Sequence, residues 1–108
     1  RSVTAAPDGS RLRLWVATQA PAQCRAAVAK ATGLAEEAIT LFPMPAGGSF
    51  GIALEHDAAV QAAIIARTID KPVQLVWSRA EEIMRDLPRA PAQARLTACR
   101  VAKLSLQS

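Results

Sequence analysis

A glycine-rich stretch is the part of this sequence best suited to chemistry. Gly47, Gly48 and Gly51 fall within five positions, between an apolar run and a long helical pattern. Glycine has no Cβ, so the main-chain N–H groups of such a loop can approach a ligand closely. The start of the following helix favours a negatively charged or electron-rich group. The stretch therefore predicts a ligand-contacting loop between a strand and a helix.

The common nucleotide-binding loops do not match this stretch. A Walker phosphate loop needs a lysine and then a serine or threonine after its glycines, whereas Ile52 and Ala53 follow Gly51. The dinucleotide fingerprint GxGxxG is not met by the spacing of the three glycines. An α/β domain that binds a simple anion such as phosphate at this loop stays open as an alternative.

Side chains that could perform acid–base or nucleophilic chemistry do not form a set. His56 is the only histidine, so no Ser/His/Asp set can be assembled, and it is expected to be exposed in the first turn of a helix. Glu81 and Glu82 are adjacent and cannot face each other as an acid–base pair. They are expected to pair with Arg79 or Arg85. No catalytic residue and no metal-ligating residue is predicted.

The cysteines and the hydropathy pattern narrow the class of protein. Cys24 and Cys99 lie far apart, without a CxxC pair or a histidine cluster, which disfavours a zinc site. Two buried free thiols are expected, and a disulfide stays open from the spacing. No apolar run reaches about 18 residues, so no membrane-spanning segment is predicted.

Composition indicates a small globular unit. The chain has 108 residues, 51% of them hydrophobic and 20% charged, which fits one folded domain with a core. The net charge of +4 is mild and its arginines are scattered, while aromatic residues make up only 4%. A nucleic-acid partner is therefore not expected. The opening at Arg1, without methionine, suggests a fragment of something larger.

The expected elements place one polar side chain beside the glycine loop. Residues 11–16 alternate between apolar and polar types, as in a strand with one buried face. Pro21 suits the first turn of a helix, which should run to Thr32 and be capped by Gly33. Gln19 then lies at a strand-to-helix junction.

The rest of the chain predicts a mixed α/β layer. A polar lead-in is expected over residues 1–10, with a turn at Pro7, Asp8 and Gly9. One single α/β unit is expected over residues 11–108, with about four strands in a mixed sheet and two main helices packed on it. Its further elements are a strand at residues 39–43, a helix from Gly51 or Leu54 to Ile69, a strand at residues 73–77, a short helical stretch at residues 79–84 and a closing extended segment at residues 94–106.

Four motifs in this order resemble a known family. They are Gln19-Ala20-Pro21, Gly47-Gly48-Ser49-Phe50-Gly51, Lys71-Pro72-Val73 and Trp77-Ser78-Arg79-Ala80-Glu81-Glu82. Together they look like the molybdenum-cofactor-binding large subunit of the xanthine dehydrogenase and aldehyde oxidase family. The likeness is greatest to the bacterial isoquinoline 1-oxidoreductase β-subunit branch and covers roughly residues 11–95. The resemblance implies a fragment of a molybdopterin-binding domain.

The resemblance also implies which residues contact the cofactor. In this family the dithiolene of a pterin holds the molybdenum, and a neutral amide with bare N–H groups can hold an oxygen-rich centre without adding a titrating group. The alternatives are Gln19 as a junction cap and Phe50 as a core residue. The implied cofactor-binding residues are Gln19 near an oxo or hydroxo ligand, the backbone of Phe50 and Gly51 at the same centre, and Gly47, Gly48 and Ser49 along the pterin side.

Departures from the family limit the expected activity. Ala53 stands where many relatives carry a basic residue, and Leu54 lies near the position of the purine-binding glutamate of the xanthine-specific members. N-heteroaromatic or aldehyde substrates therefore remain open, with water as the oxygen source. The family's catalytic glutamate and its iron–sulfur clusters have no matching positions, so the fragment alone is expected to be inactive and to carry no cofactor.

The resemblance implies partners as well. These are the rest of the large subunit and a small subunit with two [2Fe–2S] clusters, and the cofactor is expected in its cytosine dinucleotide form. Relatives occur in both cytoplasm and periplasm, so the compartment stays open. The alternative from another class is a non-catalytic α/β ligand-binding or interaction module.

Overall fold

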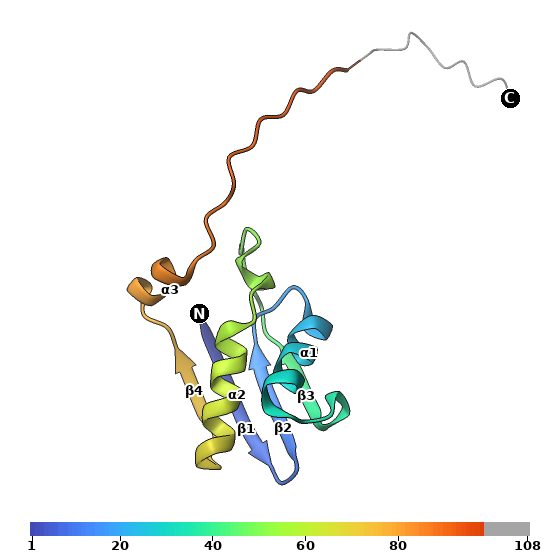
Figure 1. The fold of residues 1–108 in the computed structure, drawn as a ribbon, viewed down its shortest axis with the longest axis vertical. Coiled ribbons are helices and arrows are strands. Elements are labelled where there is room, and N and C mark those ends of the chain that lie inside the picture. Colours follow the sequence, from blue (N-terminus) through green and yellow to red (C-terminus); the bar gives the residue numbers. More distant parts are fainter. Residues whose placement is uncertain (99–108) are drawn as a thin grey trace, which may run out of the picture.

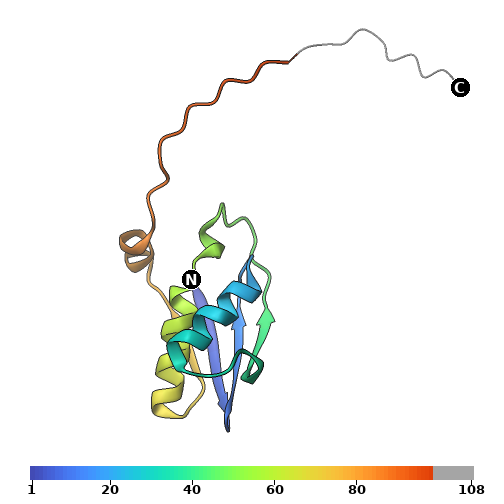
Figure 2. The same ribbon diagram turned by 45° about the vertical axis from the view of Figure 1, so that its right-hand side comes forward.

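The computed structural model describes residues 1–98 and shows a four-stranded mixed sheet (Figure 1). The strand order is β3-β2-β1-β4, and Figure 2 shows helices α1 and α2 on the same side of the sheet. The predicted mixed α/β fold is confirmed. The elements are β1 (Ser2–Asp8), β2 (Arg11–Val16), α1 (Pro21–Thr32), β3 (Ile39–Pro43), α2 (Asp57–Ile69), β4 (Val73–Val76) and α3 (Arg79–Arg85), with 3-10 turns η1 (Glu36–Ala38) and η2 (Ile52–Leu54).

Strand β1 corrects the polar lead-in predicted for residues 1–10. It lies inside the sheet and pairs antiparallel with both β2 and β4. Val3 and Ala5 point into the core and are at most 2% exposed. The turn expected near Gly9 is present and connects β1 to β2. Residues 2–8 therefore belong to the sheet, and the polar lead-in predicted for residues 1–10 was wrong.

Strands β2 and β3 pair in parallel, and this pairing decides where the site can form. Their register runs from Leu12 opposite Ile39 to Val16 opposite Pro43, and α1 is the crossover between them. The carboxyl ends of parallel neighbours lie at the same edge of a sheet. The turn after β2 and the loop after β3 therefore leave the sheet side by side (Figure 1).

Helix α1 has the predicted bounds for the predicted reasons. Pro21 occupies its first turn, and Gly33 closes it at φ +70°, with its N–H donating to the Ala29 carbonyl over 2.9 Å. Cys24 lies on the inner face and is fully buried, and burial raises the pKa of its thiol. Cys99 lies outside the described residues.

Helix α2 packs on the sheet through alanine side chains. Ala59, Ala62, Ala63 and Ala66 are at most 1% exposed, so the narrow face predicted from their spacing is confirmed. The helix begins at Asp57 and not between Gly51 and Leu54, because η2 forms a separate turn and Glu55 is extended. The helical pattern of the sequence thus runs through a break in the backbone.

After α3 the chain takes no regular structure up to residue 98 (Figure 1). The closing extended segment predicted at residues 94–106 is therefore not a strand over residues 94–98, and its remainder lies outside the described residues. Within residues 1–98 no helix combines the length and apolar character needed to cross a membrane.

Candidate functional site

Two turns meet beyond the carboxyl ends of β2 and β3. The main-chain N–H of Met44 donates to the Val16 carbonyl over 3.0 Å, which holds the two strand ends together. The N–H of Gln19 donates to the Ala53 carbonyl over 3.2 Å, and the Ser49 hydroxyl donates to Gln19 Oε1 over 2.9 Å. The structure therefore brings the predicted glutamine and the predicted glycine loop into direct contact.

Thr18 also links the same two turns, and it was not identified in the sequence analysis. Its side chain is only 9% exposed. Its hydroxyl donates to the Ala53 carbonyl over 3.2 Å and accepts from the Ala20 N–H over 3.1 Å. Threonine two residues before a helix-opening segment often bonds back to the main chain, which is the signal that could have found it.

The glycine loop is held in an uncommon backbone conformation. Gly47 and Gly51 adopt φ values of +61° and +95°, and Phe50 between them adopts +50°. A positive φ is rare for a bulky residue and costs conformational energy. The Phe50 side chain is 87% exposed, so the alternative that it is a core residue is wrong.

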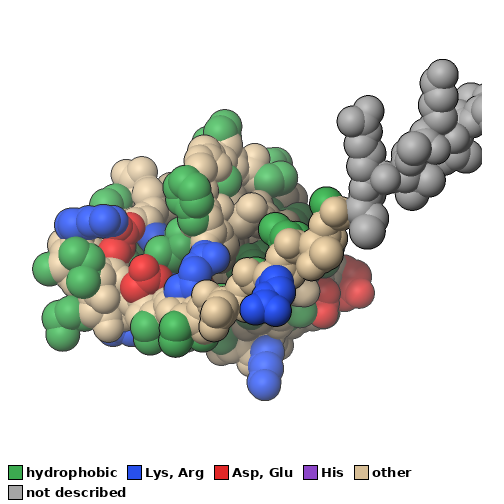
Figure 3. Space-filling view, turned by 90° about the horizontal axis from the view of Figure 1, so that it is seen from above, with side chains coloured by type: hydrophobic (Ala, Val, Ile, Leu, Met, Phe, Trp, Pro, Cys, Tyr) green, Lys and Arg blue, Asp and Glu red, His purple; other side chains and the backbone are tan. Residues whose placement is uncertain are grey.

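The loop keeps its main-chain donors available. Among the described residues, the N–H groups of residues 47–51 donate to no main-chain carbonyl. Two hollows adjoin the loop, one of about 210 Å³ and a wider one of about 670 Å³. Ser49 and Ile52 line both hollows. Gly48 lines the first, and Phe50, Gly51 and Arg89 line the second. Figure 3 views the molecule from this end, where hydrophobic, basic and acidic side chains are all visible.

Comparison with known proteins identifies the family. The model of the molybdopterin cofactor-binding domain matches residues 1–102. This chain belongs to the molybdopterin cofactor-binding domain family. It is also 42% identical over 94 residues to the isoquinoline 1-oxidoreductase subunit beta of Brevundimonas diminuta. That alignment covers 87% of this chain but 11% of the relative, so the chain spans about a tenth of the relative's length.

The residues of this molybdopterin cofactor-binding domain suit such a group. Ser49 engages Gln19 at Oε1, which fixes the amide and directs its Nε2 donors elsewhere. The loop adds main-chain donors with no side-chain charge at residues 47–51. Neutral donors of this kind match a group rich in oxygen acceptors.

The other titratable residues considered in the sequence are His56 and the charged residues of α3. His56 is not exposed in the first turn as predicted: it is the half-buried N-cap of α2, and its enclosed Nδ1 has no partner among the described residues. Arg79 pairs with Glu82 over 3.2 Å. Arg85 pairs with Glu81, and this hydrogen bond raises the pKa of the guanidinium. The predicted ion pairs on α3 are confirmed.

No three His, Cys, Asp or Glu side chains within residues 1–98 lie close enough to share a metal ion.

Proposed function

We propose that this chain is the part of a molybdenum hydroxylase large subunit that holds the molybdenum–molybdopterin cofactor between Gln19 and the glycine loop. The observation that supports it most is the hydrogen bond of 2.9 Å between the Ser49 hydroxyl and Gln19 Oε1. It joins two turns that are separated by 30 residues in sequence, at the edge where two parallel strands end. Membership of the cofactor-binding family supports the same role.

Each residue has a distinct role in this proposal. Gln19 would offer its Nε2 donors to the oxygen-rich part of the cofactor, and the Phe50–Gly51 segment would offer its main-chain donors to the same part. Gly47, Gly48 and Ser49 line the pterin side, where the absent Cβ of the glycines leaves room for close approach. Bound there, the cofactor supplies the two-electron oxidation, with water as the source of oxygen.

The substrate is proposed to be an N-heteroaromatic compound or an aldehyde. Leu54 lies in η2, directly after the loop, and is 52% exposed. An apolar side chain there gives no carboxylate for a purine to bind. The relative's name, isoquinoline 1-oxidoreductase, refers to an N-heteroaromatic compound.

The proposed assembly extends beyond this chain. The rest of the large subunit and a small subunit with two [2Fe–2S] clusters complete the enzyme, and the cofactor is of the cytosine dinucleotide form. The 108-residue segment alone is proposed to be inactive. It contributes cofactor contacts, while electron transfer falls to the partner.

The test is cofactor analysis of the full-length protein that carries this sequence. We expect molybdenum by mass spectrometry and a pterin by fluorescence after oxidation, in comparable amounts. Gln19→Leu should lower both several-fold, because it removes the amide donors. Gln23→Leu is the matched control, since Gln23 is exposed on α1 and should leave both unchanged.

Two results would overturn the proposal. One is a full-length protein without molybdenum or pterin when it is produced in cells that make the cofactor. The other is a protein that contains no cofactor but binds phosphate, with the phosphate binding abolished by Gly48→Val. That result would favour the alternative anion-binding module. That alternative depends on the N–H groups of residues 47–51, which donate to no main-chain carbonyl within residues 1–98.

A further inference from the structure

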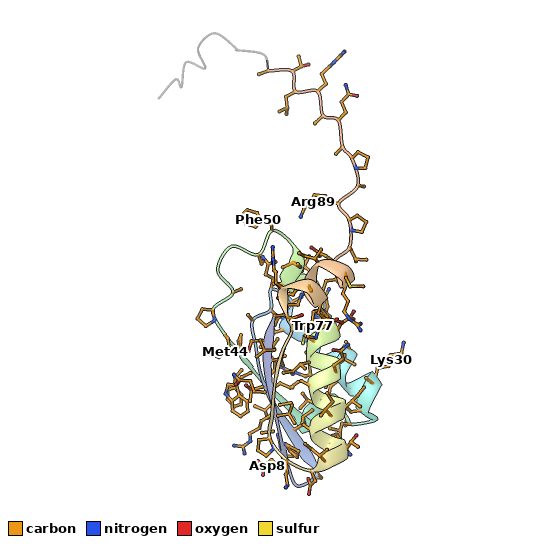
Figure 4. The ribbon with its side chains drawn as sticks, turned by 90° about the vertical axis from the view of Figure 1, so that its left-hand side faces the viewer. Asp8, Lys30, Met44, Phe50, Trp77 and Arg89 are labelled. Atoms are coloured by element: carbon orange, nitrogen blue, oxygen red, sulfur yellow. The ribbon has the colours of Figure 1, made fainter. Side chains whose placement is uncertain are left out.

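A side chain from outside the two turns contacts the strained part of the glycine loop. Arg89 lies in the segment after α3, and its Nη2 donates a hydrogen bond to the Phe50 carbonyl oxygen across 39 residues of sequence. A Cβ built on Gly51 would lie 3.3 Å from the same nitrogen. Figure 4 shows Phe50 and Arg89 at the same end of the molecule. The guanidinium therefore lies directly against the Phe50–Gly51 peptide.

This contact decides which way the peptide faces. A trans peptide is planar, and its carbonyl oxygen and N–H point in opposite directions. Because Arg89 holds the Phe50 oxygen on its own side, the Gly51 N–H points away from Arg89. Rotation of this one peptide would turn the donor around without moving any strand.

The peptide lies in a turn that the Ile52 N–H closes by donating to the Ser49 carbonyl over 3.0 Å, and its strained residue is Phe50. Phe50 and Gly51 both have positive φ, at +50° and +95°. Such conformations persist when surrounding contacts hold them. A charge-assisted hydrogen bond from a guanidinium is stronger than a neutral one. Arg89 supplies such a contact.

We propose that Arg89 is a positioning residue, which orients the Phe50–Gly51 peptide so that the Gly51 N–H faces the molybdenum centre. The inference depends on the proposed function, because it assigns a purpose to the orientation of a donor already placed at the cofactor. It also makes the irregular segment after α3 a part of the site. Arg89 acts through the loop backbone and does not itself touch the cofactor.

The test compares three variants of the full-length protein. Arg89→Met removes the donor, Arg89→Lys restores one charged donor, and Arg95→Met is the control on the same segment. Three readouts apply: the molybdenum electron paramagnetic resonance spectrum, the rate of cofactor release, and hydrogen exchange of the loop peptide covering residues 46–54.

We expect Arg89→Met to change the spectrum and to accelerate both cofactor release and loop exchange about tenfold, the effect of one lost charge-assisted hydrogen bond. Arg89→Lys should recover part of each change, and Arg95→Met should match the wild type. Thermal unfolding of all three should match the wild type, because the contact lies outside the core.

The outcomes separate the two proposals. If the wild type holds molybdenum and pterin and Arg89→Met matches it in all three readouts, the role of Arg89 is wrong and the proposed function stands. If the wild type holds neither, both proposals are wrong. If Arg89→Met and Arg89→Lys both unfold the protein, Arg89 serves folding, and the positioning role is overturned.

Discussion

The inner face of α2 and the glycine loop use small residues for opposite purposes. Ala62 and Ala63 are fully buried and bring the helix close to the sheet. Gly47 and Gly51 have positive φ and lie at the surface, where they expose main-chain donors. The two regions are separated by only a few residues in the chain. A small side chain thus permits packing in one place and access in the other.

The difference indicates how stability and the proposed cofactor binding are divided within this unit. The helix–sheet contact buries apolar surface, which provides most of the free energy of folding. The loop contributes few buried contacts, and segments of that kind can change locally at little cost to the whole. Substitutions in the two regions should therefore affect different measurements.

The largest loss of stability is expected when the alanine face is enlarged. Ala62→Leu forces extra carbon atoms between α2 and β1 and should lower the free energy of unfolding by about 1–3 kcal/mol. Urea denaturation followed by circular dichroism measures it. Ala26→Leu, on the exposed side of α1, is the control and should change stability little. Equal effects of the two substitutions would contradict the account of the packed face.

A smaller loss is expected where the two turns are joined. Thr18→Val keeps the shape but leaves the Ala53 carbonyl and the Ala20 N–H without this partner, which should cost about 1–2 kcal/mol. Thr68→Val is the control, because the Thr68 hydroxyl bonds only within its own helix and is exposed. The same denaturation experiment applies. If Thr18→Val left the free energy of unfolding unchanged, this link between the two turns would be dispensable.

Alkaline pH should weaken the packed region through Cys24. Burial raises the pKa of its thiol in the folded state, so the folded state holds this proton more tightly than the unfolded state does. The stability that depends on the protonated Cys24 thiol is fully present below about pH 8.5, the pH at which an exposed thiol ionises. It is lost as pH rises further. Unfolding at pH 7 and pH 9.5, in a Cys99→Ser background, measures it. Cys24→Ala should remove this part of the pH dependence, and an unchanged dependence would be contrary evidence.

The smallest effect on stability is expected in the loop itself. Ser49→Ala removes an exposed hydrogen bond and should change the free energy of unfolding by less than about 0.5 kcal/mol. It should nevertheless lower the cofactor content of the full-length protein, because the Gln19 amide loses its orientation. Ser10→Ala, in the exposed turn after β1, is the control. If Ser49→Ala lowered the free energy of unfolding and left the cofactor content unchanged, the contrast between the loop and the inner face of α2 would be wrong.

Local signals in the sequence predicted the ends of α1 and the buried face of β2. Pro21 and Gly33 bound α1, and the alternation in β2 correctly assigned Leu12 and Leu14 to the core. Strand β1 was missed because it is rich in small residues, and Pro7 near its end is typical of a turn. The start of α2 was placed too early, since apolar spacing alone does not reveal the break at Glu55.

Contacts between distant residues explain what sequence reasoning missed at the site. The resemblance indicated Gln19 and the glycine loop, and their proximity is confirmed, while their contact with a cofactor stays a prediction. Thr18 and Arg89 reach partners 35 and 39 residues away, which no local pattern encodes. Their roles depend on the parallel pairing of β2 with β3 and on the path after α3.

The hydroxyl of Thr18 has a consequence for how this edge of the domain can evolve. One oxygen bonds both to the Ala20 N–H at the entry of α1 and to the Ala53 carbonyl after the glycine loop, so it fixes the separation of the two turns at this point. A change in the length of either turn would break that link, so insertions or deletions on one side should be accompanied by compensating changes on the other. Among related sequences, variation is then expected in the side chains around this link and not in the lengths of the two turns.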